Sequence, residues 1–152
     1  MSEFKPFDDQ LNGLIAALSP SARSKLAGEI AKELRKSQQQ RIKLQKAPDG
    51  SPYQARKRQP LRAKNGRIKR AMFQKIRTSR YMKAIGLENS AVVEFADTVQ
   101  RIASVHQDGL KDRSNLHAHS VQYPRRVLIG FSEREKIVIM ELITDALSSR
   151  SA

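Results

Sequence analysis

Residues 81–95 read YMKAIGLENSAVVEF, and this stretch decides the fold class. Two short runs rich in apolar and β-branched residues flank Glu88, Asn89 and Ser90, which suit a short turn. We therefore expect the two runs to pair as an antiparallel hairpin. Because a lone hairpin is at best marginally stable in water, the flanking segments must supply helices that cover it.

The segment before the hairpin predicts two helices. Apolar residues recur at helical spacing between Phe7 and Leu18. Ser19 and Pro20 end this first helix and begin a second, Ser19 as the N-cap and Pro20 at the first helical position. The second helix should run to about Lys46, with an apolar face made by Leu26, Ile30, Leu34 and Leu44. Its last part, KSQQQRIKLQK, is too polar for a core helix, so we expect it to project from the body or to pack against another subunit.

The segment after the hairpin predicts a helix, a strand and a last helix. TVQRIASVHQ should form a helix that ends at Gly109. This helix places Val99, Ile102, Ala103 and His106 on one face. Residues 110–118 are typical of a loop, and HSVQYP (119–124) of a strand. The last helix should begin after Ser132, which has capping-box spacing to Glu135. Its apolar face should consist of Ile139, Met140, Leu142, Ile143, Ala146 and Leu147.

These elements predict an α+β fold, a small antiparallel sheet covered by helices. We expect one domain over residues 1–152, with a helical arm over 1–46, a basic loop over 47–70 and an α+β core over 71–150. Within the loop, turn residues dominate from Asp49 to Asn65. GRIKRAMFQKIR (66–77) should form a short helix or strand whose buried side chains are Met72, Phe73 and Ile76.

The positive charge of the chain is concentrated in one segment. The net charge is +14, and residues 41–83 hold 15 basic residues and one acid, while the remaining 109 residues balance 14 against 14. Such a segment gains by meeting polyanions or acidic protein surfaces. Three interpretations stay open: contact with a phosphate backbone, docking on an acidic protein, and a merely solvated loop. Candidate partner or phosphate contacts are Arg56, Lys57, Arg58, Arg62, Lys64, Arg67, Lys69 and Arg70.

The residue patterns offer little support for an enzyme. The chain has no cysteine, P-loop, GxSxG or HExxH motif. His106, His117 and His119 lack the further ligands that a zinc site needs. We therefore predict no catalytic residue, no metal site and no cofactor. No apolar run approaches the roughly 18 residues of a membrane span, and MSEFKPFDDQ has no signal-peptide pattern, so we expect no membrane partner.

Several motifs in order resemble the phage virion-morphogenesis family of contractile-tailed temperate phages. They are QRI at 40–42, APDGSPYxxRK at 47–57, VHQxGL at 105–110 and YPRRVLIGFSxxE at 123–135. The resemblance spans about residues 7–147. The recurring features map onto Pro48, Asp49, Gly50, His106, Gln107, Gly109, Pro124, Arg126, Leu128, Gly130 and Ser132. We interpret them as structural: a turn, a helix stop and a strand-to-helix junction.

The resemblance implies a structural role without catalysis, in which family members finish the tail and join it to the DNA-filled head. It implies a ring of identical subunits at the head-proximal end of the tail, with other tail or neck proteins as partners. Assembly would take place in the host cytoplasm, with the virion as the end point. The basic segment would then meet an acidic neighbour, which we favour because no sequence-reading element is present, or DNA. The alternative is a non-specific nucleic-acid-binding protein that acts through residues 41–83.

Overall fold

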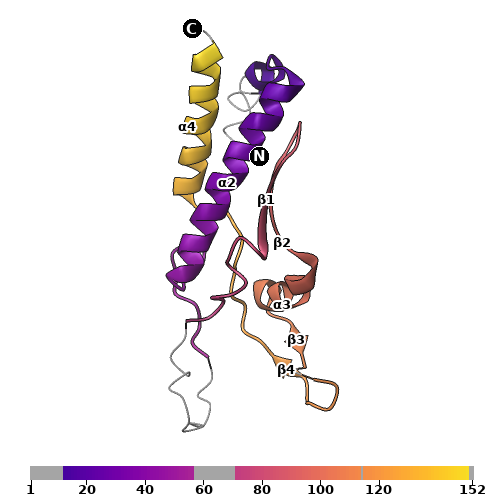
Figure 1. The fold of residues 1–152 in the computed structure, drawn as a ribbon. Helices are drawn as coiled ribbons and strands as arrows, with labels where there is room; N and C mark the ends of the chain where they lie inside the picture. Colours follow the sequence, from indigo (N-terminus) through magenta and orange to yellow (C-terminus); the bar gives the residue numbers. More distant parts are fainter. Residues whose placement is uncertain (1–11, 57–70, 114, 151–152) are drawn as a thin grey trace. The chain divides into compact units, whose positions relative to one another are not determined.

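The computed structural model describes residues 12–56, 71–113 and 115–150. Figure 1 shows the element order, which is α2 (Pro20–Lys43), β1 (Met82–Gly86), β2 (Ala91–Phe95), α3 (Asp97–Asp108), β3 (Lys111–Asp112), β4 (Val121–Gln122) and α4 (Glu133–Arg150). The described chain forms two compact units. Unit 1 comprises residues 12–34, 84–93 and 133–150, and unit 2 comprises residues 35–56, 71–83, 94–113 and 115–132.

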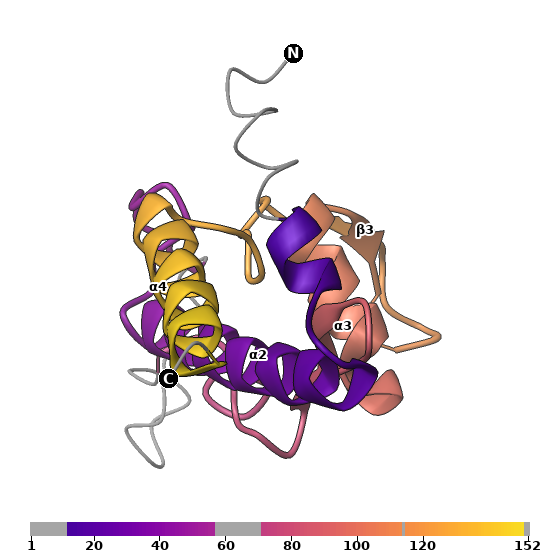
Figure 2. The same cartoon turned by 90° about the horizontal axis from the view of Figure 1, so that it is seen from above.

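Unit 1 is built on apolar packing between the N-terminal part of α2 and α4, which lie side by side in Figures 1 and 2. Leu18, Leu26 and Ile143 are buried together at its centre. The partly buried side chains around them are Ile15, Ala22, Ile30, Ile139, Ala146 and Leu147. Most of the predicted apolar face of α4 is therefore confirmed.

The predicted junction before α2 is also confirmed. A short helical segment covers residues 12–16, and α2 begins at Pro20. The Ser19 hydroxyl accepts a hydrogen bond from the backbone N–H of Ala22 at 3.2 Å, as an N-cap does.

The hairpin formed by β1 and β2 approaches α2 very closely within unit 1. The N–H of Leu87 donates to the carbonyl of Ser90 at 2.8 Å and closes the predicted turn. A Cβ placed on Gly86 would lie 2.2 Å from the backbone nitrogen of Gly28 and 2.5 Å from its Cα. Because no side chain fits in that space, glycine is required at residue 86 for the hairpin to reach the helix.

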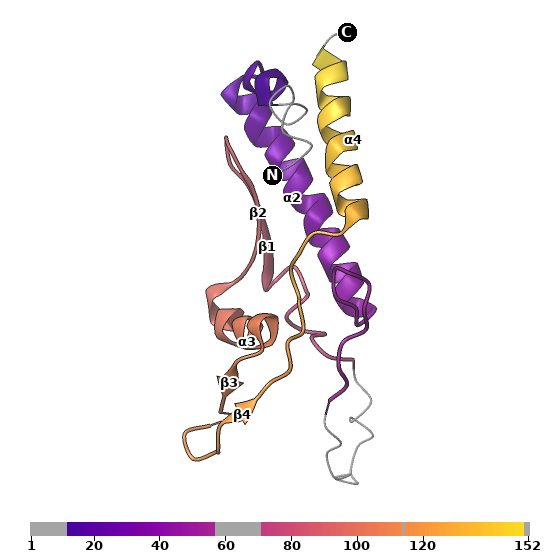
Figure 3. The same ribbon diagram turned by 180° about the vertical axis from the view of Figure 1, so that it is seen from behind.

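Unit 2 contains α3 and the β3–β4 ribbon. Gly109 ends α3 in the left-handed conformation with φ 63°, as predicted. The ribbon is antiparallel and pairs Lys111 with Gln122, and it is seen below α3 in Figure 3. The buried face of α3 consists of Val99, Ala103 and Val105. Ile102, which was expected on the same helical face as Val99 and Ala103, is 50% exposed.

The α+β fold class is confirmed, but several boundaries differ from the predictions. The strands form two separate two-stranded sheets in the described part of the chain. α2 ends at Lys43, and Leu44 is 56% exposed instead of returning to the apolar face. Residues 71–77 form successive turns, neither helix nor strand. The segment 110–118 contains β3, and the predicted strand 119–124 pairs only at β4.

The predicted division into arm, loop and core stays a prediction. In the part of the chain that the structure describes, no helix is both long and apolar enough to cross a membrane.

Candidate functional site

The basic loop expected over residues 47–70 starts at a tight turn made by Pro48, Asp49 and Gly50. The N–H of Gly50 donates to the carbonyl of Ala47 at 2.9 Å, and Gly50 has a φ of 87°, which favours glycine. The Asp49 carboxylate accepts hydrogen bonds from the hydroxyl of Ser51 at 2.5 Å and from its N–H at 2.9 Å. These bonds lower the pKa of Asp49. The motif is therefore a turn, as we interpreted it.

Two side-chain amides in unit 2 hold the extended backbone at residues 128–130. Gln107 accepts from the N–H groups of Leu128 at 2.7 Å and Ile129 at 3.0 Å, and it donates to the carbonyl of Ile129 at 2.8 Å. Gln38 of α2 donates to the carbonyl of Gly130 at 2.9 Å and accepts from its N–H at 3.2 Å. The two glutamines thus supply the backbone partners that a neighbouring strand would supply in a sheet.

This arrangement corrects one expectation from the sequence. The polar end of the second helix was expected to project or to meet another subunit, yet Gln38 is 2% exposed and Ile42 is fully buried within unit 2. The expectation fails because Gln38 buries its amide with both hydrogen-bonding ends satisfied. A Cβ on Gly130 would also lie 2.7 Å from the ring of Pro48, so the turn packs closely against the same segment.

The backbone that leads into the basic segment is held by Arg126 and Tyr53. Arg126 is 5% exposed and donates from Nε to the carbonyl of Gln54 at 2.8 Å and from a terminal nitrogen to that of Ala55 at 3.4 Å. The Tyr53 hydroxyl donates to the carbonyl of Val127 at 2.8 Å. Burial raises the pKa of Tyr53 to about 12, so this hydroxyl keeps its proton.

The backbone that leads out of the basic segment is held by Gln45. Its side chain donates to the carbonyl of Met72 at 2.9 Å and accepts from the N–H of the same residue at 2.9 Å. The rings of Tyr53 and Phe73 meet edge to face with centroids 5.7 Å apart. The two ends of the basic segment therefore lie beside each other. We call the stretch between residues 55 and 72 the insert. Residues 53–55, 72 and 73, together with the side chains that bond them, form what we call the insert root.

A row of rings extends from the insert root to His106 and Tyr123. The centroid of His106 lies 4.8 Å from that of Phe73 and 5.1 Å from that of Tyr123. Nδ1 of His106 lies 3.3 Å from a terminal nitrogen of Arg126. Because a guanidinium can donate hydrogen bonds but cannot accept them, Nδ1 must be the acceptor. Burial, followed by the charges of Arg126 and Arg56, lowers the pKa of His106. The imidazole is therefore a neutral acceptor.

The structure describes few of the predicted cationic contacts. Arg56 is exposed at the insert root. Lys57, Arg58, Arg62, Lys64, Arg67, Lys69 and Arg70 lie outside the described residues. The rings of Tyr53 and Phe73 pack against each other, so this contact covers one edge of the pair.

The remaining motif residues lie at the ends of elements in unit 2. Gly109 caps α3, Pro124 follows β4, and Ser132 directly precedes α4. The predictions from sequence missed Gln38 and Gln45, whose partners are 92 and 27 residues away. The one available signal, for Gln38, was the run of glutamines at 38–40 in the polar end of the helix.

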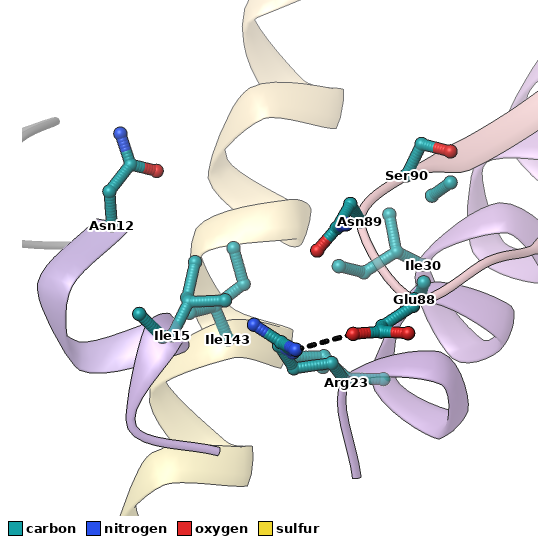
Figure 4. A pocket seen from close by; sticks show the side chains of 12 residues that line it. Asn12, Ile15, Arg23, Ile30, Glu88, Asn89, Ser90 and Ile143 are labelled. Carbon is teal, nitrogen blue, oxygen red and sulfur yellow. Dashed lines mark hydrogen bonds and ion pairs between the residues drawn. The ribbon is translucent and has the colours of Figure 1, made fainter. Parts of the chain in front are cut away.

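Unit 1 contains a hollow of about 360 Å³. Its apolar wall includes Ile15, Ile30 and Ile143, and Figure 4 shows Arg23 and Glu88 joined by an ion pair of 2.7 Å beside it. Among the described residues, no three His, Asp or Glu side chains are grouped so that they could hold a metal ion.

Comparison with known proteins identifies a family and a curated relative. The sequence profile of the phage virion morphogenesis family matches residues 2–148. The chain is 46% identical over 144 residues to a protein named tail completion protein S, from Escherichia phage P2, an alignment that covers 94% of this chain and 96% of the relative. No solved structure matches.

Proposed function

Because the chain belongs to the phage virion morphogenesis family, we propose that it is a structural assembly protein that completes a phage tail and enables the tail to join the head. The observation that carries the proposal is the 46% identity to tail completion protein S over almost the full length of both chains. In this proposal the protein has no catalytic role, and it acts in the host cytoplasm during assembly.

The use of the motif residues supports a structural role. The polar groups of Gln107 and Arg126 form hydrogen bonds with backbone atoms of their own chain, and Gly109 ends a helix. A catalytic constellation would instead keep such groups directed at an open site. The motifs therefore serve the shape of unit 2 and the position of the insert root.

We further propose that the protein acts as a ring of identical subunits at the head-proximal end of the tail, in contact with other tail or neck proteins. A ring would repeat the charge of the basic segment at regular intervals and so create a strong local field. The insert root supports this proposal, since it fixes both ends of the segment that carries the charge.

Electron microscopy of a lysate that lacks the gene tests the assembly role. We expect separate heads and tails that do not join, and restoration of joined particles when the wild-type gene is supplied in trans. Normal numbers of joined, infectious particles without the protein would refute the proposal.

Charge reversal of the insert tests its contribution to joining. The variant R56E/K57E/R58E/R62E should fold, because Arg56 is exposed at the insert root, and it should lower the yield of joined particles. Raised ionic strength should weaken joining by the wild-type protein in the same direction, because salt screens surface charges. Wild-type titres from a folded variant would show that joining does not need the charge of the insert, which would then be only a solvated loop.

A further inference from the structure

A second group of cations lies in unit 2, outside the segment 56–70. Its members are exposed and project from the C-terminal part of α2 and from the turns that precede β1 and its first residues. They are Lys36, Lys43, Lys75, Arg80 and Lys83. We call this group the cationic face.

Hydrogen bonds bring the two sources of the cationic face together. The amide of Gln39 on α2 donates to the hydroxyl of Ser79 at 3.2 Å. Lys36 and Lys43 stand three residues before and four residues after Gln39, so they share its side of the helix. Lys83 of β1 donates from Nζ to the carbonyl of Ser79 in the turns at 3.3 Å, and Arg80 follows Ser79 in the chain. The views in Figures 1 and 3 agree that these turns run beside α2.

In the described part of the chain, no carboxylate is paired with the cationic face. Neither residues 35–43 nor residues 71–83 contain an acid. In the described part of the chain, none of the five cations forms an ion pair. The nearest acid along the sequence is Glu33, three residues before Lys36 in α2, and no ion pair joins the two in the described part of the chain.

We propose that the cationic face binds the sugar–phosphate backbone of duplex DNA. A phosphate backbone needs only cations at suitable intervals, because its affinity comes from the release of condensed counterions. Lys36 and Lys43 are about 10 Å apart along the helix at 1.5 Å per residue. Two lysines on one side of a rigid helix therefore hold two positive charges at a fixed separation, and a backbone of regularly repeated phosphates can meet both.

The composition of the face argues against a protein partner. Protein interfaces are depleted of lysine and centred on aromatic or apolar residues. The cationic face is mostly lysine, and Tyr81 beside it is partly buried under the guanidinium of Arg80, 5.4 Å from the ring centroid. This inference rests on the proposed function in one respect: the protein would meet DNA at the joint between tail and head.

The experiment measures binding of the full-length protein to a mixed-sequence duplex by fluorescence anisotropy at several salt concentrations. The test variant is K36Q/K43Q/K75Q/R80Q/K83Q. The control variant removes the same number of exposed cations elsewhere, K25Q/K111Q/R113Q/R134Q/K136Q, and so keeps the same net charge as the test variant. Circular dichroism and thermal melting confirm that both variants fold.

We expect the slope of log affinity against log salt to become shallower by about 4 in the test variant, because each phosphate that a cation no longer neutralises removes about 0.9 from the slope. The control variant should keep a slope within about 1 of the wild type. Binding should not depend on sequence, because the cations meet only phosphates.

Three results would overturn the proposal. One is a wild-type protein that does not bind the duplex at low salt, and another is a test variant with the wild-type slope. The third is a test variant that binds DNA normally but fails to support joining, which would assign the face to an acidic protein. Because binding is measured on purified protein, a negative DNA-binding result would not bear on the gene-deletion test of tail completion. In the same way, a negative gene-deletion result would not bear on the measured DNA binding.

Discussion

The two parts of α2 are buried by different forces. In the N-terminal part, Leu26 packs against Ile143 among other aliphatic side chains. In the C-terminal part, Gln38 is 2% exposed because its amide bonds Gly130, 92 residues away. One helix is thus held by apolar area at one end, and at the other end by satisfied polar groups together with the buried side chain of Ile42. Only the first kind of burial leaves a periodic pattern in the sequence.

The largest effect should come from removing apolar area in unit 1. Leu26→Ala should lower the free energy of unfolding by about 3 kcal/mol, since it removes a buried side chain and leaves a cavity. Leu26→Met, which conserves volume, should cost less than about 1.5 kcal/mol. Hydrogen exchange should show loss of protection in α4 before loss in α3. Equal loss in both helices would show that the two units unfold together and would break the comparison.

A close backbone approach in unit 1 should give the next largest effect. Gly86→Ala should cost about 2 to 3 kcal/mol, because the new Cβ would lie 2.2 Å from the backbone of Gly28. Gly28→Ala is the matched control. Nothing lies within 4 Å of a Cβ placed on Gly28, so alanine there should raise the free energy of unfolding by about 1 kcal/mol through its higher helix propensity. Urea denaturation measures both changes. A neutral Gly86→Ala would mean that the hairpin does not need its close contact with α2.

The polar end of the helix should be sensitive to a change that conserves size. Gln38→Leu should lower the free energy of unfolding by about 2 kcal/mol, because the N–H of Gly130 loses its partner in a buried position. The carbonyl of Gly130 retains a bond from Arg41 at 3.2 Å, which limits the loss. Protection should fall first in α3.

Gln39→Leu is the control for this change. Gln39 follows Gln38 directly and bonds an exposed hydroxyl, that of Ser79, so its replacement should change stability by less than about 0.5 kcal/mol. Equal costs at the two glutamines would contradict the claim that burial of the polar group sets the effect.

The sequence predicted features that are local along the chain. The hairpin, the cap at Ser19 and the stop at Gly109 depend on residues within a few positions of one another, and all three are confirmed. The insert root was not predicted, because Gln45, Met72 and Arg126 are far apart in sequence and are joined only by hydrogen bonds. Apolar periodicity carries no information about such bonds. For the same reason, the polar end of α2 was misinterpreted as a projecting surface.

The smallest predicted effect concerns the charge state of His106, the histidine in the ring row of unit 2. Its pKa is lowered in the folded protein by burial and by the charges of Arg126 and Arg56, so the unfolded chain binds a proton at a higher pH than the folded chain does. The stability contributed by neutral His106 is therefore fully present above about pH 6.5 and is lost as the pH falls below that value. Thermal melting from about pH 7.5 to 5.5, above the range where carboxylates titrate, should show a decline in wild type and a flatter profile in His106→Gln, whose amide can still accept from Arg126. His117→Gln, at an exposed position, should retain the wild-type decline. A decline of equal size in His106→Gln would mean that the polar contacts of unit 2 tolerate a charged imidazole, and that the insert root does not depend on the neutral ring.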